Sequence, residues 1–172
     1  MGNRKSREWM KRVRNQEDRE HWENVPRGLY EDVSWQGCGA RRLQLAFLPS
    51  FEDCYSWDIR EVGDDAFFLY RSGVDSIWNQ PVAIRPGYTK LEVESDELRG
   101  HLAALRQIAL NICPAFTGML GLDGTYYELA LFGDESSGVR FQWWSDGPKQ
   151  WEQLTKLAGE LIGRFKSLQR VT

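Results

Sequence analysis

The chain has two histidines and three cysteines, the residue types used most often for acid–base and nucleophilic catalysis. His21 lies in a polar N-terminal segment, and His101 lies at the edge of an apolar stripe in a predicted helix. Neither belongs to a recognisable motif, so a nucleophile pair of His101 with Cys54 or Cys113 would have to form in space. Free cysteines usually pack as small hydrophobic side chains, and that interpretation suffices here. We predict no catalytic residues.

Metal binding would need converging carboxylates, imidazoles or thiols. Asp58, Glu61, Asp64 and Asp65 gather around one predicted turn, but their spacing does not match that of a calcium loop. The three cysteines are far apart and form no Cys-x-x-Cys pair, which argues against a zinc finger and a disulfide framework. The glycines at 118, 121 and 124 lack the Lys-Ser/Thr pair of a phosphate-binding loop. We therefore expect no metal and no other cofactor, and interpret the carboxylates as a solvated turn.

The first 14 residues are strongly basic. They carry one acid, Glu8, and six cations, namely Arg4, Lys5, Arg7, Lys11, Arg12 and Arg14. This balance of +5 within a chain of net charge −3 leaves −8 for residues 15–172. Clustered Lys and Arg bind phosphate by releasing counterions, so residues 4–14 predict nucleic-acid binding as one alternative function. Acidic residues between 17 and 23 cancel the charge farther along, which favours a solvated helix docked through Trp9 and Trp22.

Aromatic content is high, with 8 Trp, 6 Tyr and 8 Phe. Exposed tryptophans often anchor protein interfaces, because they offer a large contact area and one N–H donor. Trp143 and Trp144 are consecutive in a predicted strand, so if Trp143 faces the core, Trp144 must point away from it. Trp78 lies in a segment rich in Pro and Gly, and loops on rigid sheets often carry function. Trp144 and Trp78 are therefore candidate contact residues, whereas core packing would account for most other tryptophans.

The elements that must position these residues are clearest between Asp123 and Leu168. Alternating apolar residues predict strands over 125–132 and 139–144, which the polar loop 133–138 joins into a hairpin. Pro148 suits the first turn of a helix, and the apolar stripe that follows consists of Trp151, Leu154, Ala158, Leu161, Ile162, Phe165 and Leu168. We expect this helix, residues 148–168, to pack across the apolar face of the hairpin.

Earlier segments predict further strands and two more helices. A charged helix is expected over 3–24, a weak strand over 29–35, and firmer strands over 43–48, 55–62 and 66–71. Asp64 and Asp65 fall in the turn between the last two. Prolines and glycines predict an irregular segment over 72–90. A short strand over 91–94 then leads into a helix over 95–112, with Ser95 as its cap and Pro114 as its stop.

One resemblance is carried by the run Asp123-Gly124-Thr125-Tyr126-Tyr127-Glu128-Leu129, followed by Trp143-Trp144, Pro148 and Trp151-x-x-Leu154. This pattern resembles small bacterial α+β domains of unknown function, some of which are similar to immunity proteins of contact-dependent and polymorphic toxin systems. The resemblance covers roughly the last 50 residues and carries no active site. It implies a cytoplasmic inhibitor that neutralises a partner by surface contact, and an acidic body would suit a basic toxin such as a nuclease. The basic N-terminal arm departs from that pattern.

Length and composition favour one domain. With 172 residues, of which 41% are hydrophobic, the chain can form one core, which we place in residues 25–172 after a helical arm over 1–24. It has no apolar run of the ~18 residues that a membrane span needs, and its N-terminus is too charged for a signal peptide, so we expect a cytoplasmic protein. The predicted fold is α+β: a mainly antiparallel sheet of about six strands, with two helices packed on one face and the N-terminal helical arm.

Three functions remain open from the sequence. The leading one is a non-enzymatic protein-binding module of the immunity type, whose expected contact residues are Trp144, Asp134, Glu135, Trp78, Asp64 and Asp65. The second is nucleic-acid binding through the basic arm. The third is a small-ligand binder or hydrolase with a Trp-lined cleft, for which a deep pocket holding His101 or several carboxylates would be the sign.

Overall fold

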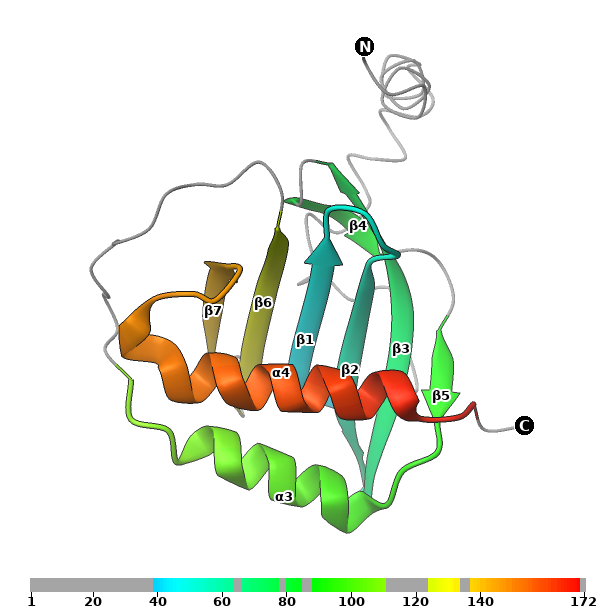
Figure 1. Cartoon of the computed structure of the whole chain (residues 1–172). Helices are drawn as coiled ribbons and strands as arrows, with labels where there is room; N and C mark the ends of the chain where they lie inside the picture. Colours follow the sequence, from blue (N-terminus) through cyan, green and yellow to red (C-terminus); the bar gives the residue numbers. More distant parts are fainter. Residues whose placement is uncertain are drawn as a thin grey trace.

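The computed structural model describes residues 39–63, 66–77, 80–84, 88–110, 124–133 and 137–170. These residues form the elements labelled in Figure 1, which are β1 (Ala40–Pro49), β2 (Tyr55–Val62), β3 (Ala66–Ile77), β4 (Gln80–Ile84), β5 (Thr89–Leu91), α3 (Ser95–Arg106), β6 (Thr125–Phe132), β7 (Gly138–Trp144), a 3-10 turn η1 (Lys149–Trp151) and α4 (Glu152–Ser167). The arm predicted for 1–24 and the strand predicted for 29–35 lie outside the described residues.

The strands form one antiparallel sheet. Six of them follow one another in the order β4-β3-β2-β1-β6-β7, and the short β5 pairs with β3. Every pairing is antiparallel, including that of β1 with β6, which are far apart in the sequence. The predicted sheet of about six strands is confirmed.

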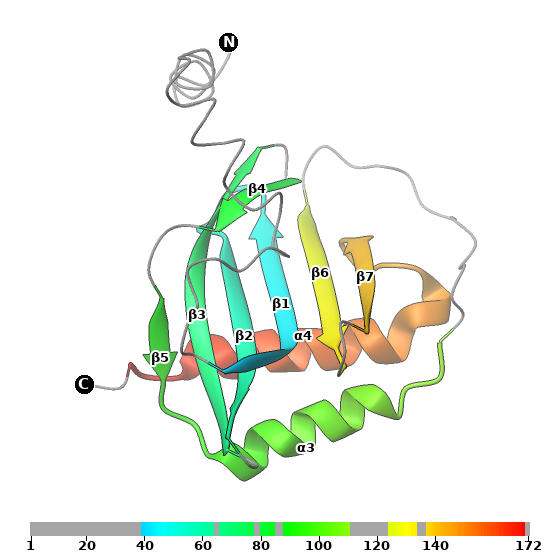
Figure 2. The same ribbon diagram turned by 180° about the vertical axis from the view of Figure 1, so that it is seen from behind.

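Both helices lie against the same face of this sheet. Figure 1 shows α4 crossing the strands with α3 running beside it, and Figure 2 shows the opposite face, which neither helix covers. The shared core contains fully buried residues from strand and helix alike, such as Trp57 of β2 and Phe165 of α4, whose ring centroids are 6.3 Å apart. None of the described helices is long and apolar enough to cross a membrane.

Alternation along the strands explains which side chains enter this core. On β1, Leu43, Leu45 and Phe47 face the helices, and Ala46 and Leu48 belong to a second, smaller apolar cluster. On α4, the buried side chains are Leu154, Ala158, Leu161, Ile162 and Phe165, at the spacings of three and four that the sequence shows. The predicted packing of the last helix across the hairpin is confirmed, since residues of β6, β7 and α4 share one cluster.

The structure corrects three local expectations. The segment 72–90 is not irregular throughout, because β3 continues to Ile77 and β4 follows it. The helix predicted over 95–112 ends at Arg106, and beyond it Ile108 and Leu110 pack against the core two residues apart, an extended spacing. The N-cap position is Glu94 rather than Ser95, which is the first residue of the helix. The Ser95 hydroxyl oxygen accepts a hydrogen bond from the Phe67 N–H at 2.9 Å and so ties α3 to β3.

Candidate functional site

The β6–β7 hairpin is a regular element at one end of the strand order. Its two strands pair without interruption from Tyr126 opposite Trp144 to Phe132 opposite Gly138. At one end the Ser145 N–H donates to the Thr125 carbonyl oxygen at 2.7 Å. Near the turn, the Gly133 N–H donates to the Ser137 carbonyl oxygen at 2.8 Å. The backbone on which Trp144 stands is therefore fixed at both ends.

Trp144 lies on the sheet face opposite the one that α3 and α4 pack against. Its neighbour Trp143 is 5% exposed in the helix-side core and stacks on Tyr127, with ring centroids 5.4 Å apart and planes 9° apart. Because successive strand residues point to opposite faces, Trp144 projects the other way, as the sequence predicts, and is half-buried there.

Gly124 and Ser50 hold Trp144 in place. A side-chain carbon at Gly124 would lie 2.7 Å from ring atoms Cε2 and Cζ2 of Trp144, so the ring fits only against a glycine. Gly124 is itself clamped by Ser50, whose hydroxyl donates to the Gly124 carbonyl oxygen at 2.8 Å and accepts from the Gly124 N–H at 3.1 Å. Trp144 is therefore a positioned aromatic side chain.

On the side of the hairpin that points away from α3 and α4, aromatic and polar side chains lie together. We call this set the hairpin face and define it as Tyr126, Glu128, Arg140, Gln142 and Trp144; Arg140 and Gln142 are exposed, Tyr126 and Trp144 are half-buried, and Glu128 is buried. The Gln142 amide donates to Glu128 Oε2 at 2.6 Å. Glu128 is 1% exposed, and its Oε1 has no hydrogen-bond partner. Burial raises the pKa of the Tyr126 phenol, and the Glu128 carboxylate adds to that effect, so this phenol stays protonated and can donate a hydrogen bond.

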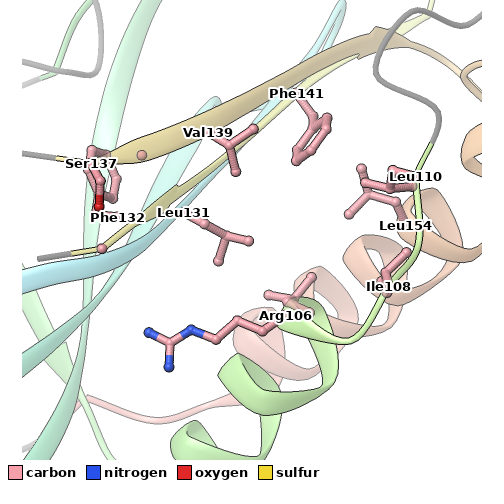
Figure 3. A pocket seen from close by; sticks show the side chains of 12 residues that line it. Arg106, Ile108, Leu110, Leu131, Phe132, Ser137, Val139, Phe141 and Leu154 are labelled. Atoms are coloured by element: carbon pink, nitrogen blue, oxygen red, sulfur yellow. The ribbon is translucent and has the colours of Figure 1, made fainter.

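The other side of the hairpin borders an apolar groove of about 420 Å³. Figure 3 shows Leu131, Val139 and Phe141 of the hairpin facing Leu110 and Leu154 across this groove. Arg106, at the end of α3, is the charged member of the lining, and among the described lining residues there is no tryptophan, histidine or carboxylate. The groove therefore lacks the features expected of a Trp-lined cleft with His101.

A buried ion cluster lies on the same sheet face as Trp144. Arg41 Nε lies 2.8 Å and Arg60 Nη2 lies 3.2 Å from Asp58 Oδ2, and Arg60 also donates to the Gly39 carbonyl oxygen at 2.9 Å. Asp58 and Arg60 are each 2% exposed. The cluster joins β1 to β2 and keeps each buried charge close to one of opposite sign.

The carboxylates considered for metal binding do not converge. Asp58 is held by the two arginines, and Glu61, three residues on, pairs with Arg42. Within the described ranges there is no group of three or more His, Cys, Asp or Glu side chains placed to hold a metal ion. Asp64 and Asp65, the other two members, lie outside those ranges.

Cys54 and His101 do not form the nucleophile pair that the sequence left as an alternative. Cys54 is buried in the cluster of Ala46, Leu48 and Val74. His101 belongs to the helix layer on the other side of the sheet, where its ring meets Phe165 at 6.1 Å between centroids and its Nε2 lies 3.5 Å from Glu97 Oε1. The sheet separates the thiol from the imidazole. Cys113 is outside the described residues.

Of the contact residues predicted from the sequence, the structure describes Trp144. The others, Asp134, Glu135, Trp78, Asp64 and Asp65, lie outside the described residues, as do Arg4, Lys5, Arg7, Lys11, Arg12 and Arg14 of the basic arm. Sequence reasoning missed the Gly124 clamp, the Glu128–Gln142 pair and the groove. A signal for the pair existed, because both residues occupy outward positions in two strands that were already expected to form a hairpin.

Comparison of the chain with protein-family models, curated proteins and solved structures finds no match. The likeness of the last part of the chain to toxin-system immunity proteins stays a prediction. Function must therefore be inferred from the residues and their geometry.

Proposed function

We propose that this protein is a non-enzymatic binding module of the immunity type, which recognises a partner protein through the hairpin face. The observation that carries the proposal is the position of Trp144. This large aromatic side chain stands half-buried on a hydrogen-bonded hairpin and is held by Gly124 on the sheet face away from both helices. Aromatic side chains held in this way lose little conformational entropy on binding, which favours their use as interface anchors.

The surroundings of Trp144 suit a protein partner. Arg140 and Gln142 are exposed on the same face, and the half-buried Tyr126 lies opposite Trp144 in the strand register. An aromatic centre bordered by polar side chains is the usual composition of a protein-binding surface, where Trp, Tyr and Arg are enriched.

The charge distribution favours a basic partner, such as a nuclease toxin. Residues 15–172 carry −8, so a cationic protein would be attracted to this body at long range. The exposed charged residue of the hairpin face is the cation Arg140, because the acid on this face, Glu128, is buried. Acidic contacts would therefore come from elsewhere, and Asp134 and Glu135, Asp64 and Asp65, together with Trp78, remain the proposed additions to the surface.

The test starts from the purified products of the neighbouring genes, each offered to the full-length protein in a pull-down, with affinity then measured by calorimetry. Replacing Trp144 by Ala removes the anchor and should weaken binding by about 30-fold, the effect of an interface hot spot of about 2 kcal/mol. Lys156→Ala changes an exposed residue of α4, on the other side of the sheet, and should leave the affinity unchanged.

Gly124→Ala supplies a second variant, because it displaces the Trp144 ring without removing it. It should weaken binding to a similar extent. If Trp144→Ala and Gly124→Ala both bind as well as the native protein, the hairpin face is not the interface. If none of the proteins tested binds and the native protein instead turns over a substrate, the binding-module proposal is wrong.

A further inference from the structure

The turn between β1 and β2, residues 50–54, presents an aromatic side chain to solvent. Phe51 is 84% exposed, which makes it the most exposed large apolar side chain in the part of the chain that the structure describes. Single exposed apolar residues are ordinary on protein surfaces. Phe51 differs from an ordinary case in the way its turn is held and in the residues beside it.

The β1–β2 turn is fixed at both ends. The Ser50 N–H donates to the Gly124 carbonyl oxygen at 3.0 Å, in addition to the two bonds that the Ser50 hydroxyl makes with Gly124. At the other end, Cys54 is buried and its carbonyl oxygen accepts a hydrogen bond from the Val74 N–H at 3.0 Å. Phe51 is therefore displayed by a backbone that is already ordered, so little backbone entropy is lost when a partner covers it.

This turn lies at the same end of the sheet as Trp144. Gly124, which Ser50 binds, is also the residue against which the Trp144 ring fits. β1 ends opposite the first residue of β6, and β7 ends opposite the second, as Figure 1 shows. Adjacent strands are about 4.8 Å apart, so about 10 Å separates β1 from β7. A standard interface covers about 800 Å² of each protein, which is wide enough to include both Phe51 and Trp144.

The turns at this end of the sheet also supply acidic side chains. Glu52 and Asp53 are exposed, and so is Asp146 in the turn that follows β7. Glu52 Oε2 lies 3.6 Å from Lys166 Nζ, whereas Asp53 Oδ2 accepts a hydrogen bond at 3.3 Å from the neutral phenol of Tyr55. Asp53 and Asp146 therefore bring to this end the exposed negative charge that the hairpin face lacks.

We propose that Phe51 is a second aromatic anchor of the interface centred on Trp144, and that it enters an apolar pocket of a basic partner protein while Asp53 and Asp146 face the partner's cations. This inference rests on the proposed function and adds the β1–β2 turn to its surface. Buried aromatic anchors give affinity, and complementary charge at the rim gives steering and specificity.

The same acids disfavour other occupants. Anionic lipid and nucleic acid attract basic surfaces, so both would be repelled by Asp53 and Asp146. A second copy of the chain related by a twofold axis would present the same patch, and the acids of the two copies would then lie close together. A cationic protein is the occupant that the charge of this end favours.

Site-specific photo-cross-linking in the cells that produce the chain tests the contact. A benzophenone amino acid replaces, one at a time, Phe51, Gln142 of the hairpin face or Lys156 of α4, all of them exposed. We expect the probes at 51 and 142 to capture the same protein, with a basic isoelectric point. Capture at 51 should fall strongly in Trp144→Ala, and the probe at 156 should not capture this protein.

The outcomes separate the inference from the proposed function. Capture of a protein at 142 but not at 51 would overturn the role of Phe51 and leave the hairpin face as the interface. Capture at neither position would count against both. A second copy of the chain, an acidic protein or nucleic acid linked at 51 would overturn the proposed occupant.

Affinity for the captured protein, once purified, gives the size of the effect. Phe51→Ala should weaken binding about tenfold, and because Phe51 is exposed, its unfolding midpoint should equal that of the native chain. Val139→Ala is the matched control, since it shortens another exposed apolar side chain, 48% exposed, near the other end of β7, and should bind as the native chain does. Asp53→Asn and Asp146→Asn should slow association, most strongly at low salt. Native affinity in Phe51→Ala would overturn the inference.

Discussion

Glu97 of α3 and Arg164 of α4 form a two-point ion pair between the helices. Arg164 Nε lies 2.7 Å from Glu97 Oε1, and Arg164 Nη2 lies 2.9 Å from Glu97 Oε2. Hydrogen bonding by Arg164 is the main reason that the pKa of the Glu97 carboxyl lies below its usual 4.5, and His101, one turn along α3, lowers it further. The same contact raises the pKa of Arg164. Two helices that share one face of the sheet are thus joined at their solvent side.

This pair predicts a specific acid dependence of stability. Because the Glu97 pKa is lowered by folding, its contribution is fully present above about pH 4.5 and is lost as the pH falls through the folded value. In Glu97→Gln, the unfolding free energy should therefore fall less steeply between about pH 5 and pH 3 than in the native protein. Denaturant titrations at each pH measure the slope, with the exposed α4 residue Glu160→Gln as the control. Equal slopes for native protein and Glu97→Gln would contradict this role.

The buried ion cluster predicts a large penalty for removing one charge. Asp58→Asn leaves the guanidinium groups of Arg41 and Arg60, both almost fully buried, without their carboxylate. Breaking such a pair from one side costs about 3–5 kcal/mol. Glu61→Gln breaks the more exposed pair with Arg42 and should cost less than about 1 kcal/mol. Urea unfolding of both variants compares the two costs, and a mild effect at Asp58 would mean that the cluster does not hold β1 to β2.

Substituting the two adjacent tryptophans of β7 one at a time should show that Trp143 is needed for stability and that Trp144 contributes much less to it. Trp143→Ala opens a cavity where the ring stacks on Tyr127 and should cost about 3–5 kcal/mol of unfolding free energy. Trp144→Ala removes a half-buried ring from the other face and should cost about 1 kcal/mol. Guanidinium unfolding measures the stability of both variants, and near-ultraviolet circular dichroism shows whether their aromatic packing is kept. Equal destabilisation would show that Trp144 is as much a part of the core as Trp143.

The regular parts of the fold could be predicted because each carries apolar residues at the period of a strand or of a helix. The alternation of Leu43, Leu45 and Phe47 and the stripe from Leu154 to Phe165 each match one geometry, so strand and helix were assigned correctly. The end of α3 was not predictable in this way. Apolar residues continue through Ile108 and Leu110, so the sequence shows no stop before Pro114, and tertiary packing decides that these residues leave the helix.

The site was predictable only as far as strand alternation reaches. Strand alternation places Trp144 and Trp143 on opposite faces of the sheet. The hydrogen bonds between Ser50 and Gly124, however, join residues 74 positions apart, and no local sequence pattern signals them. The position of β7 at the edge likewise depends on β1 pairing with β6, a contact between distant segments. The charge of a residue did not predict its exposure, because Asp58, which was expected in a solvated turn, is buried beside two arginines.

The turn between β7 and the last helix contains two residues with positive φ, Ser145 and Gly147. Substitution of each tests how far the turn depends on glycine. Gly147 has φ +72°, and a side-chain carbon there would lie 2.8 Å from Thr155 Cγ2 and from Trp143 Cδ1. Gly147→Ala should therefore cost about 2 kcal/mol or more, the backbone term of about 1–2 kcal/mol plus the clash. Ser145 has φ +49°, so Ser145→Gly should relieve strain and leave stability unchanged or raised by up to about 1 kcal/mol. Denaturation midpoints compared at equal m-values measure both changes. A Gly147→Ala variant as stable as the native protein would mean that the turn can rearrange without disturbing Trp143.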